Sequence, residues 1–348
     1  MNQLDIDALT KVAETIHVTM VTKVYGDGAA PTLKSLLSSI KKIYQRFSPE
    51  IHAGTIVIVK TLSDDRIGLT EVPEVITSLD ALPPLGSACS VIQAFNNGSY
   101  MIWHLESVDP GSLADGAIVY KFFRGVETFY AGGQSAEVIK LSSAFASNFA
   151  IPTFHDLRTA LEEYKSLKAR HCSCKILQGI WHDAKRLFLR RKPESIMRDS
   201  LAQFLDAVLG TVAEVRPEQN MDESKPVDIK VTWFMSQKIA IIEIKWMGSS
   251  RDAKKLRQKY DEARANRGAK QLVEYLDLNK PQAPQNTTRG YLIVYDARRR
   301  NLIESTASLA KEDAFYFQNR EIKFQPDYAT ERIDFEAPMR FFLEPLAG

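Results

Sequence analysis

The chain has 348 residues, 45% of them hydrophobic and 25% charged, and its 45 lysines and arginines nearly balance 43 acidic residues, leaving a formal net charge of +2. This composition is typical of an ordinary globular protein of about two domains and argues against a disordered or fibrous chain. The near-neutral overall charge says nothing about nucleic-acid binding, so only a local basic cluster can indicate it.

The sequence also favours a cytoplasmic protein without a membrane segment. The first residues, MNQLD, lack the basic stretch and apolar core of a signal peptide, and no apolar run approaches the roughly 20 residues that cross a bilayer. Three cysteines are few and odd in number, which favours reduced thiols. Structural zinc sites use four ligands, usually in two separated pairs. No second pair accompanies the HCSC run at 171–174, so we expect a helix end or a loop there.

Residues 1–150 are expected to form a separate α/β domain. Residues 4–16 favour a helix, and Pro31 begins an amphipathic helix whose apolar residues recur with helical spacing up to Phe47. Strands are predicted at 54–61, 90–95, 99–105 and 117–123. The Asn96-Asn97-Gly98 run indicates a hairpin turn because Asn and Gly tolerate positive φ. Gly132-Gly133 is typical of another turn, and no motif in this region indicates a function.

Residues 151–192 are expected to form a basic helical connector, with helices over 152–169 and 175–190. Nine lysines and arginines lie between residues 165 and 192, against Asp183 as the one acid. Two interpretations are equally open. This segment, including Arg190 and Arg191, is either a surface that faces DNA phosphates or a solvated face of a connecting helix.

Residues 193–348 are expected to form the second domain. Pro193 suits the first turn of a helix over 194–209, and strands are predicted at 212–216, 228–234 and 238–246. A long polar helix is expected over 251–278, where Gly268 is a candidate break. Further strands are expected at 289–296 and 321–325.

Two acidic residues and one lysine in this domain have the spacing of a catalytic site. Glu243 and Lys245 are two apart on a strand and therefore point to the same face. With a hairpin turn at residues 236–237, Asp228 lies opposite Lys245, and Glu243 is the diagonal neighbour at roughly 7–8 Å. Asp228 and Glu243 are then able to share one cation. A register shift of one residue would instead turn Asp228 to the other face.

Glu194 adds a third candidate carboxylate. It lies three residues before Met197 and seven before Leu201, on the buried face of its helix. Three carboxylates, a backbone carbonyl and waters match a hard octahedral cation, so Mg²⁺ or Mn²⁺ is the expected cofactor, held by Asp228, Glu243 and Glu194. Such a cation lowers the pKa of a bound water and stabilises charge on a phosphoryl group, while Lys245 orients the water or neutralises that charge.

Gln271 and Tyr275 are four residues apart on the predicted helix and share one face. If that face is turned to the sheet, they are placed to hydrogen-bond the catalytic lysine or a DNA phosphate. The alternative is that Tyr275 belongs to the hydrophobic core with Leu272 and Leu276, and taken alone this alternative is favoured.

Residues 193–296 resemble the PD-(D/E)xK nuclease superfamily, which has the restriction-endonuclease-like fold. The first motif element is present as Pro226-Val227-Asp228, and the second as Glu243-Ile244-Lys245. Glu194 is similar to the glutamate of the family's first helix, and the 271–275 run is similar to the QxxxY motif of RecB-like members. Arg216-Pro217-Glu218 resembles the end of the family's first core strand, which makes Glu218 a weaker candidate ligand.

The resemblance implies an α/β fold with a central mixed sheet flanked by helices, Mg²⁺ dependence and cleavage of DNA, less often RNA. We therefore expect a metal-dependent endonuclease that acts on DNA, as an effector of restriction or anti-phage defence. The N-terminal domain is expected to sense a signal, to oligomerise as part of a homo-oligomer, or to dock a partner or activator. Two alternatives stay open: a nucleic-acid-binding or assembly module with a catalytically silent nuclease fold, and a structure-selective DNA repair nuclease.

Overall fold

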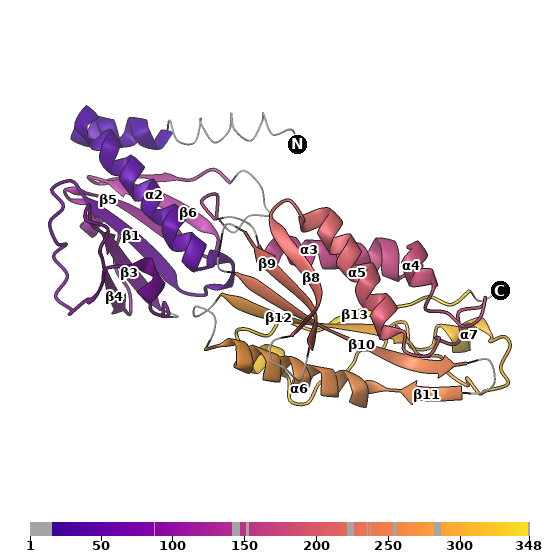
Figure 1. Cartoon of the computed structure of the whole chain (residues 1–348). Coiled ribbons are helices and arrows are strands. Elements are labelled where there is room, and N and C mark those ends of the chain that lie inside the picture. Colours follow the sequence, from indigo (N-terminus) through magenta and orange to yellow (C-terminus); the bar gives the residue numbers. More distant parts are fainter. Residues whose placement is uncertain are drawn as a thin grey trace. The chain divides into compact units, whose positions relative to one another are not determined.

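A computed structural model describes residues 16–86, 88–140, 147–150, 153–220, 226–234, 236, 238–252, 256–281 and 287–346. The chain divides between His155 and Asp156 into two compact units, which are described separately (Figure 1). The α/β class is confirmed, because each unit contains a mixed sheet flanked by helices. Residues 156–192, expected to form a connector, belong to the second unit. The helix predicted at 4–16 lies almost wholly outside the described residues.

The first unit combines helices with a seven-stranded sheet of order β2-β4-β3-β1-β5-β6-β7. A helix over residues 16–25 is followed by α2 (Ala30–Arg46), and short 3₁₀ turns span Asp27–Ala29, Pro49–Ile51, Leu79–Ala81 and Ser112–Ala114. The strands are β1 (Thr55–Thr61), β2 (Glu74–Ile76), β3 (Cys89–Ala94), β4 (Tyr100–Leu105), β5 (Ala117–Phe123), β6 (Val126–Ala131) and β7 (Gln134–Glu137). β1 and β3 are parallel, and the other registered pairs are antiparallel.

Helix α2 covers one face of this sheet, and the amphipathic helix predicted from Pro31 is confirmed. Pro31 lies in its first turn, and its buried stripe packs with the inward residues of β1 and β5, such as Ile58 and Tyr120. The predicted hairpin is confirmed, because β3 and β4 pair around a turn in which Gly98 has φ +84°. The β6–β7 turn uses Gly132 and Gly133, both at positive φ. The strands β2, β6 and β7 were not predicted.

The core of the first unit also contains a buried carboxylate. Glu127 accepts hydrogen bonds from the hydroxyls of Tyr120 and Ser147 and from the backbone N–H of Asn148, and Tyr120 in turn meets the hydroxyl of Tyr44 at 2.9 Å. Burial raises the pKa of Glu127, and the donated hydrogen bonds oppose that rise. Both of its oxygens have partners, so this network ties β5 and β6 together.

The second unit is built on a six-stranded sheet of order β13-β12-β10-β9-β8, with β11 paired to β10. β12 is parallel to both β10 and β13, whereas β8, β9 and β11 run antiparallel to their partners. The strands are β8 (Ala213–Asn220), β9 (Pro226–Trp233), β10 (Ile239–Arg251), β11 (Leu256–Tyr260), β12 (Thr288–Ala297) and β13 (Met339–Phe342). The helices are α3 (Phe154–Glu163) with a π-helical continuation (Tyr164–Ala169), α4 (Lys175–Gln178), α5 (Glu194–Leu209), α6 (Glu262–Asn279), α7 (Lys311–Ala314) and α8 (Tyr328–Glu331).

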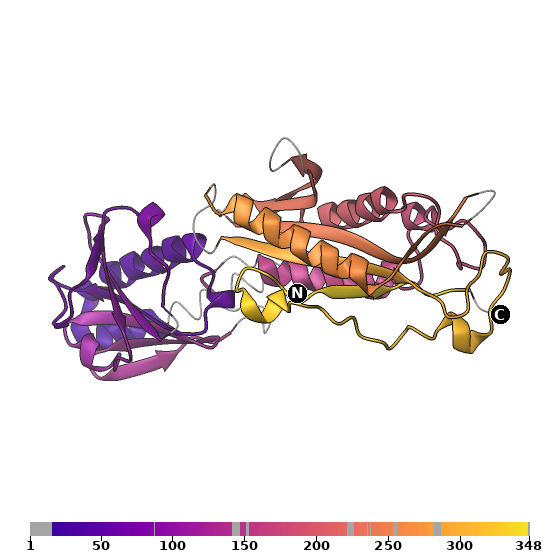
Figure 2. The same cartoon turned by 90° about the horizontal axis from the view of Figure 1, so that it is seen from below.

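Helices cover both faces of this sheet (Figures 1 and 2). On one face α6 packs Leu272 and Tyr275 against inward residues of β10 and β12. On the other face the α3 segment and α5 meet the sheet, where the hydroxyl of Tyr295 bonds both Tyr164 and the carbonyl of Met197. None of the described helices is long and apolar enough to span a bilayer.

The predicted helix over 175–190 is wrong. The helix α4 ends at Gln178, and the chain then folds back so that Trp181 bridges Leu189, which also bridges Ser250 of β10. The carboxylate of Asp183 accepts hydrogen bonds from the backbone N–H groups of the next turn and stabilises a loop there. Arg190 and Arg191 therefore lie in an exposed loop, not on a helix.

The helix predicted from residue 251 begins eleven residues later. β10 continues to Arg251 and pairs with β11, and α6 starts only after Asp261, whose carboxylate caps the N–H of Ala263. The helix passes through Gly268 without a break. The strand predicted at 321–325 is also wrong: this segment is extended but has no registered strand partner among the described residues.

Candidate active site

The site residues of β9 and β10 share a face, but in a different register from the predicted one. The observed pairs run from Ile239–Thr232 to Ile242–Ile229, so continuing the register places Asp228 level with Glu243 instead of Lys245. The difference is two residues, and a shift of two keeps every side chain on its face. β9 pairs with residues 239–242 of β10 and β11 with 248–251, so residues 243–247 are registered with β12 alone.

The Asp228 carboxylate lies at the point where the pairing of β9 with β10 stops. Its Oδ2 accepts a hydrogen bond from the backbone N–H of Ile244 at 2.8 Å. The side chain of Asp228 thus bonds the backbone of β10 just beyond the last registered pair of β9 and β10. Its Oδ1 is 3.7 Å from a guanidinium nitrogen of Arg198, and the side chain is 15% exposed. Burial raises the pKa of Asp228, and the Ile244 N–H and Lys245 only partly oppose the rise.

A buried hydrogen bond joins Glu243 and Lys245 next to Asp228. The ammonium of Lys245 donates to Oε1 of Glu243, whose residue is 1% exposed. Oε2 of Glu243 is buried and has no hydrogen-bond partner among the described residues. Burial, reinforced by the charge of Asp228, raises the pKa of Glu243 to about 8. Burial alone would lower the pKa of Lys245, but Glu243 and Glu194 together raise it, so the lysine stays charged.

Gly268 of α6 leaves space for the side chain of Lys245. A Cβ atom at this position would lie 2.5 Å from Cγ of Lys245 and 3.1 Å from a methyl group of Leu292. The residue has ordinary helical backbone, so it serves close packing of the helix on the Lys245 stem and not a break in the helix.

Glu194 reaches the site from the first residue of α5. Its Oε1 is 3.5 Å from the Lys245 ammonium, and its Oε2 accepts a hydrogen bond from Arg264 of α6 at 2.8 Å. Glu194 thus lies beside the site residues of β10, but its contact is with the lysine, whereas the sequence analysis expected it to be a metal ligand. Across the part of the chain that is described, no three His, Cys, Asp or Glu side chains gather closely enough to hold a metal ion. The expected convergence of three carboxylates is therefore not seen, and Lys245 bridges Glu243 and Glu194.

Asp228 and Glu243, which lie level with each other on β9 and β10, still fit a hard divalent cation. Mg²⁺ usually retains several waters and is held by one or two carboxylates together with substrate phosphates. Asp228 and Glu243 supply two carboxylates, and the buried Oε2 of Glu243 is a ligand atom to which no described residue donates a hydrogen bond. Because an unpaired buried oxygen is costly, this atom favours a cation at this position.

Two arginines at the site were missed by the sequence analysis. Arg198 pairs with Glu218 of β8 at 2.7 Å and approaches Asp228, while Arg264 stacks on the ring of Tyr260 at 4.2 Å and holds Glu194. The spacing of Arg198 four residues after Glu194 on one helix face was the available signal. Glu218 lies at positive φ and faces this arginine, so in this structure it is an ion-pair partner.

Gln271 and Tyr275 connect α6 to the strand that presents Asp228. The amide of Gln271 donates to the hydroxyl of Tyr275 at 2.6 Å, and that hydroxyl donates to the carbonyl of Pro226 at 3.0 Å. Tyr275 is 1% exposed and belongs to the core. The core interpretation holds for Tyr275. The pair faces the sheet, but its described bonds reach the backbone two residues before Asp228 and not the lysine, and a contact with a DNA phosphate stays a prediction.

We expect Tyr275→Phe to lower the free energy of unfolding by about 1–2 kcal/mol, because the carbonyl of Pro226 and the amide of Gln271 lose their shared partner. Chemical denaturation measures this change. Gln271→Ala, which leaves the bond to Pro226 intact, is the matched control and is expected to cost less. If Tyr275→Phe were as stable as the native protein, the hydrogen bond from Tyr275 to Pro226 would not contribute to stability.

The raised pKa of Glu243 predicts a pH-dependent stability of the metal-free protein. In the folded state the carboxyl group of Glu243 keeps its proton up to about pH 8, whereas in the unfolded state it loses the proton near its ordinary pKa of 4.5. Stability contributed by the group is therefore complete below pH 4.5 and is lost as pH rises through 8. In EDTA, Glu243→Gln is expected to remove this loss, which is on the order of 3 kcal/mol between pH 5 and 9. If the unfolding free energies of the native protein and of Glu243→Gln changed with pH in the same way, this prediction would be wrong.

Arg190 and Arg191 do not contribute to this cluster by any described bond. Both are exposed, and Nε of Arg190 donates to the backbone carbonyl of Trp181 at 2.9 Å. Their expected contact with DNA phosphates stays a prediction.

Comparison of the chain with protein-family models, with curated proteins and with solved structures finds no match.

Proposed function

We propose that the second unit is a Mg²⁺-dependent nuclease of the PD-(D/E)xK type, with the restriction-endonuclease-like fold, that hydrolyses phosphodiester bonds in DNA. The observation that supports it best is the meeting of Asp228, Glu243 and Lys245 where the pairing of β9 with β10 stops. Two buried carboxylates with raised pKa values next to an ammonium are the groups that a phosphodiester hydrolase needs.

Each residue has a distinct role in this proposal. Asp228 and Glu243 would hold Mg²⁺ or Mn²⁺, which activates water and neutralises phosphoryl charge when bound. The Lys245 ammonium donates a hydrogen bond to the attacked phosphate and offsets its developing negative charge. Glu194, held by Arg264, keeps the ammonium in position from its second side.

The wider role remains a prediction from sequence. It comprises restriction or anti-phage defence, a cytoplasmic location, a homo-oligomer, and a first unit that senses a signal or docks a partner. A silent nuclease fold that only binds nucleic acid is the outcome to be distinguished by experiment.

The test is cleavage of supercoiled plasmid by the full chain with Mg²⁺ or Mn²⁺. We expect nicking that EDTA abolishes and that Lys245→Ala lowers by about 10²–10³-fold, whereas Lys230→Ala, on the neighbouring strand outside the site, retains it. Calorimetric titration with Mn²⁺ is the second measurement, and Asp228→Asn is expected to weaken binding. Absence of both cleavage and Mn²⁺ binding would reject the proposal.

A further inference from the structure

A long groove follows the outer edge of the second unit's sheet. β13 is the edge strand there, and β12 is its one registered strand partner among the described residues. One wall is the exposed side of the α3 segment, and the other is segment 318–325, which we call the strap. Met339 and Phe342 also line the cavity. The cavity is about 1180 Å³. This exceeds the roughly 300–1,000 Å³ of sites for compact small molecules and suits an extended chain.

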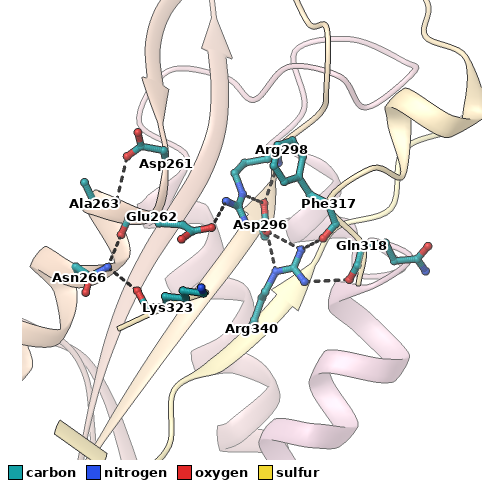
Figure 3. Close-up of polar contacts among 10 residues, drawn as sticks. All are labelled: Asp261, Glu262, Ala263, Asn266, Asp296, Arg298, Phe317, Gln318, Lys323 and Arg340. Atoms are coloured by element: carbon teal, nitrogen blue, oxygen red, sulfur yellow. Dashed lines mark hydrogen bonds and ion pairs between the residues drawn. The ribbon is translucent and has the colours of Figure 1, made fainter. Parts of the chain in front are cut away.

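The strap is held in place by a buried ion cluster (Figure 3). Asp296 is fully buried at the end of β12 and binds the guanidinium groups of Arg298 and Arg340. Arg340 also donates to the carbonyls of Phe317 and Gln318, where the strap begins. Arg340 is therefore committed to fixing the groove's shape, because all of its described bonds are internal.

The groove is rich in basic side chains on both walls. Its lining contains six lysines and arginines, Arg158, Lys165, Arg170, Arg320, Lys323 and Arg340, against three acids, Glu162, Glu321 and Asp327. On the α3 wall the side chains of Arg158, Lys165 and Arg170 are 58%, 41% and 53% exposed. The acids that pair with Arg158 and Arg170 are largely buried, but the Lys165–Glu162 pair is exposed on both sides and therefore weak. The exposed parts of all three basic side chains are open to a polyanion.

Aromatic side chains accompany these charges. Phe324 of the strap and Phe342 of β13 line the groove and are each half-buried. A positively charged groove with aromatic faces is the arrangement that binds single-stranded nucleic acid, where phosphates meet cations and unstacked bases meet rings.

The far end of the strap is attached to the helix that contacts the candidate active site. The side-chain amide of Asn266 donates to the carbonyl of Lys323 (Figure 3). Its oxygen accepts a hydrogen bond from the N–H of Gln325. Two residues earlier on the same helix, Arg264 binds Glu194. Helix α6 thus connects the strap to the carboxylate that contacts Lys245.

We propose that the groove between α3 and the strap binds a single strand of nucleic acid. That the bound strand is the substrate cut at Asp228 and Glu243 rests on the proposed function, whereas binding itself does not. The enzyme would then prefer single-stranded DNA, or duplexes with single-stranded ends, over closed duplex.

The experiment measures binding by the full chain in EDTA, so that cleavage does not enter. Fluorescence anisotropy follows a labelled single strand of about 20 nucleotides and a duplex of equal length across a salt series. In the variant Arg158→Glu/Lys165→Glu/Lys323→Glu, affinity for the single strand is expected to fall at least about tenfold, and the slope of log K against log salt to flatten by about 2. A matched control, Lys34→Glu/Lys41→Glu/Lys42→Glu, makes the same charge change on exposed residues of α2 in the first unit.

A second variant, Arg158→Gln/Lys165→Gln/Lys323→Gln, removes the same charges without reversing them, in case the glutamate variant does not fold. Thermal unfolding is recorded for each protein. Equal loss in the control variant, or tighter binding of duplex than of single strand, would overturn the proposal. So would groove variants that lose binding to an acidic peptide but keep the oligonucleotide, since the groove would then be a protein-docking site. A plasmid that is still cut while the groove variants bind normally would refute the groove and leave the proposed nuclease intact.

Discussion

Asp228→Asn and Glu243→Gln are each expected to lower the rate of Mg²⁺-dependent DNA cleavage by at least about 10³-fold. Both changes keep the shape of the side chain and remove a negative charge from the position where the cation is expected. Initial rates of plasmid nicking at saturating Mg²⁺ measure the effect. The folded structure is expected to persist, because an asparagine amide at position 228 still offers an oxygen to the Ile244 N–H, and a glutamine amide at position 243 still offers one to Lys245.

The matched control for this pair is Asp199→Asn. Asp199 lies on α5, and its side chain is 57% exposed and 3.7 Å from the guanidinium of Arg198. The control removes one carboxylate near the site but not in it, so the rate is expected to change less than a few-fold. Cleavage by either site variant at the native rate would show that these carboxylates do not hold the cation.

Gly268→Ala is expected to destabilise the protein by about 1–2 kcal/mol and to lower the cleavage rate at least about tenfold. In an ordinary helix this substitution is stabilising by about 1 kcal/mol. Here the new methyl group would overlap Cγ of Lys245, so the lysine must move away from Glu243 and Glu194. Denaturant unfolding and the nicking assay measure the two effects.

A double-mutant cycle isolates the cause. In a Lys245→Ala background the overlapping Cγ is gone, and Gly268→Ala is then expected to be neutral or stabilising. The coupling energy between the two positions is expected to be on the order of 1–3 kcal/mol. Additive effects of the two substitutions would mean that Gly268 is required for another reason, such as its approach to Leu292.

The elements that the sequence predicted well are those in which one pattern dominates. The spacing of α2 and the apolar run of β1 each correspond to one buried face and were placed within a residue or two. The shared face of Asp228 and Glu243 was also predicted, because moving a turn of unchanged length by one residue shifts the register by two and keeps each side chain on its face.

The errors arose where neighbours distant in sequence decide the structure. Residues 247–251, Met-Gly-Ser-Ser-Arg, resemble a strand end, yet Ser249 and Ser250 are buried because β11 and Leu189 pair with β10 there. Likewise, nothing local to Arg264 indicates that it will meet Glu194, seventy residues away in sequence. Such contacts depend on the tertiary fold, which single-sequence patterns do not contain.

The two oxygens of Glu243 are unequally engaged, one by the ammonium of Lys245 and the other by no described donor. A cation that binds the second oxygen would leave the first bond intact, so a single planar group would fix the spacing between metal and lysine. Aspartate at this position, one methylene shorter, would withdraw from both at once. If the proposed cation binds there, a substitution at Glu243 is expected to change metal affinity and lysine placement together.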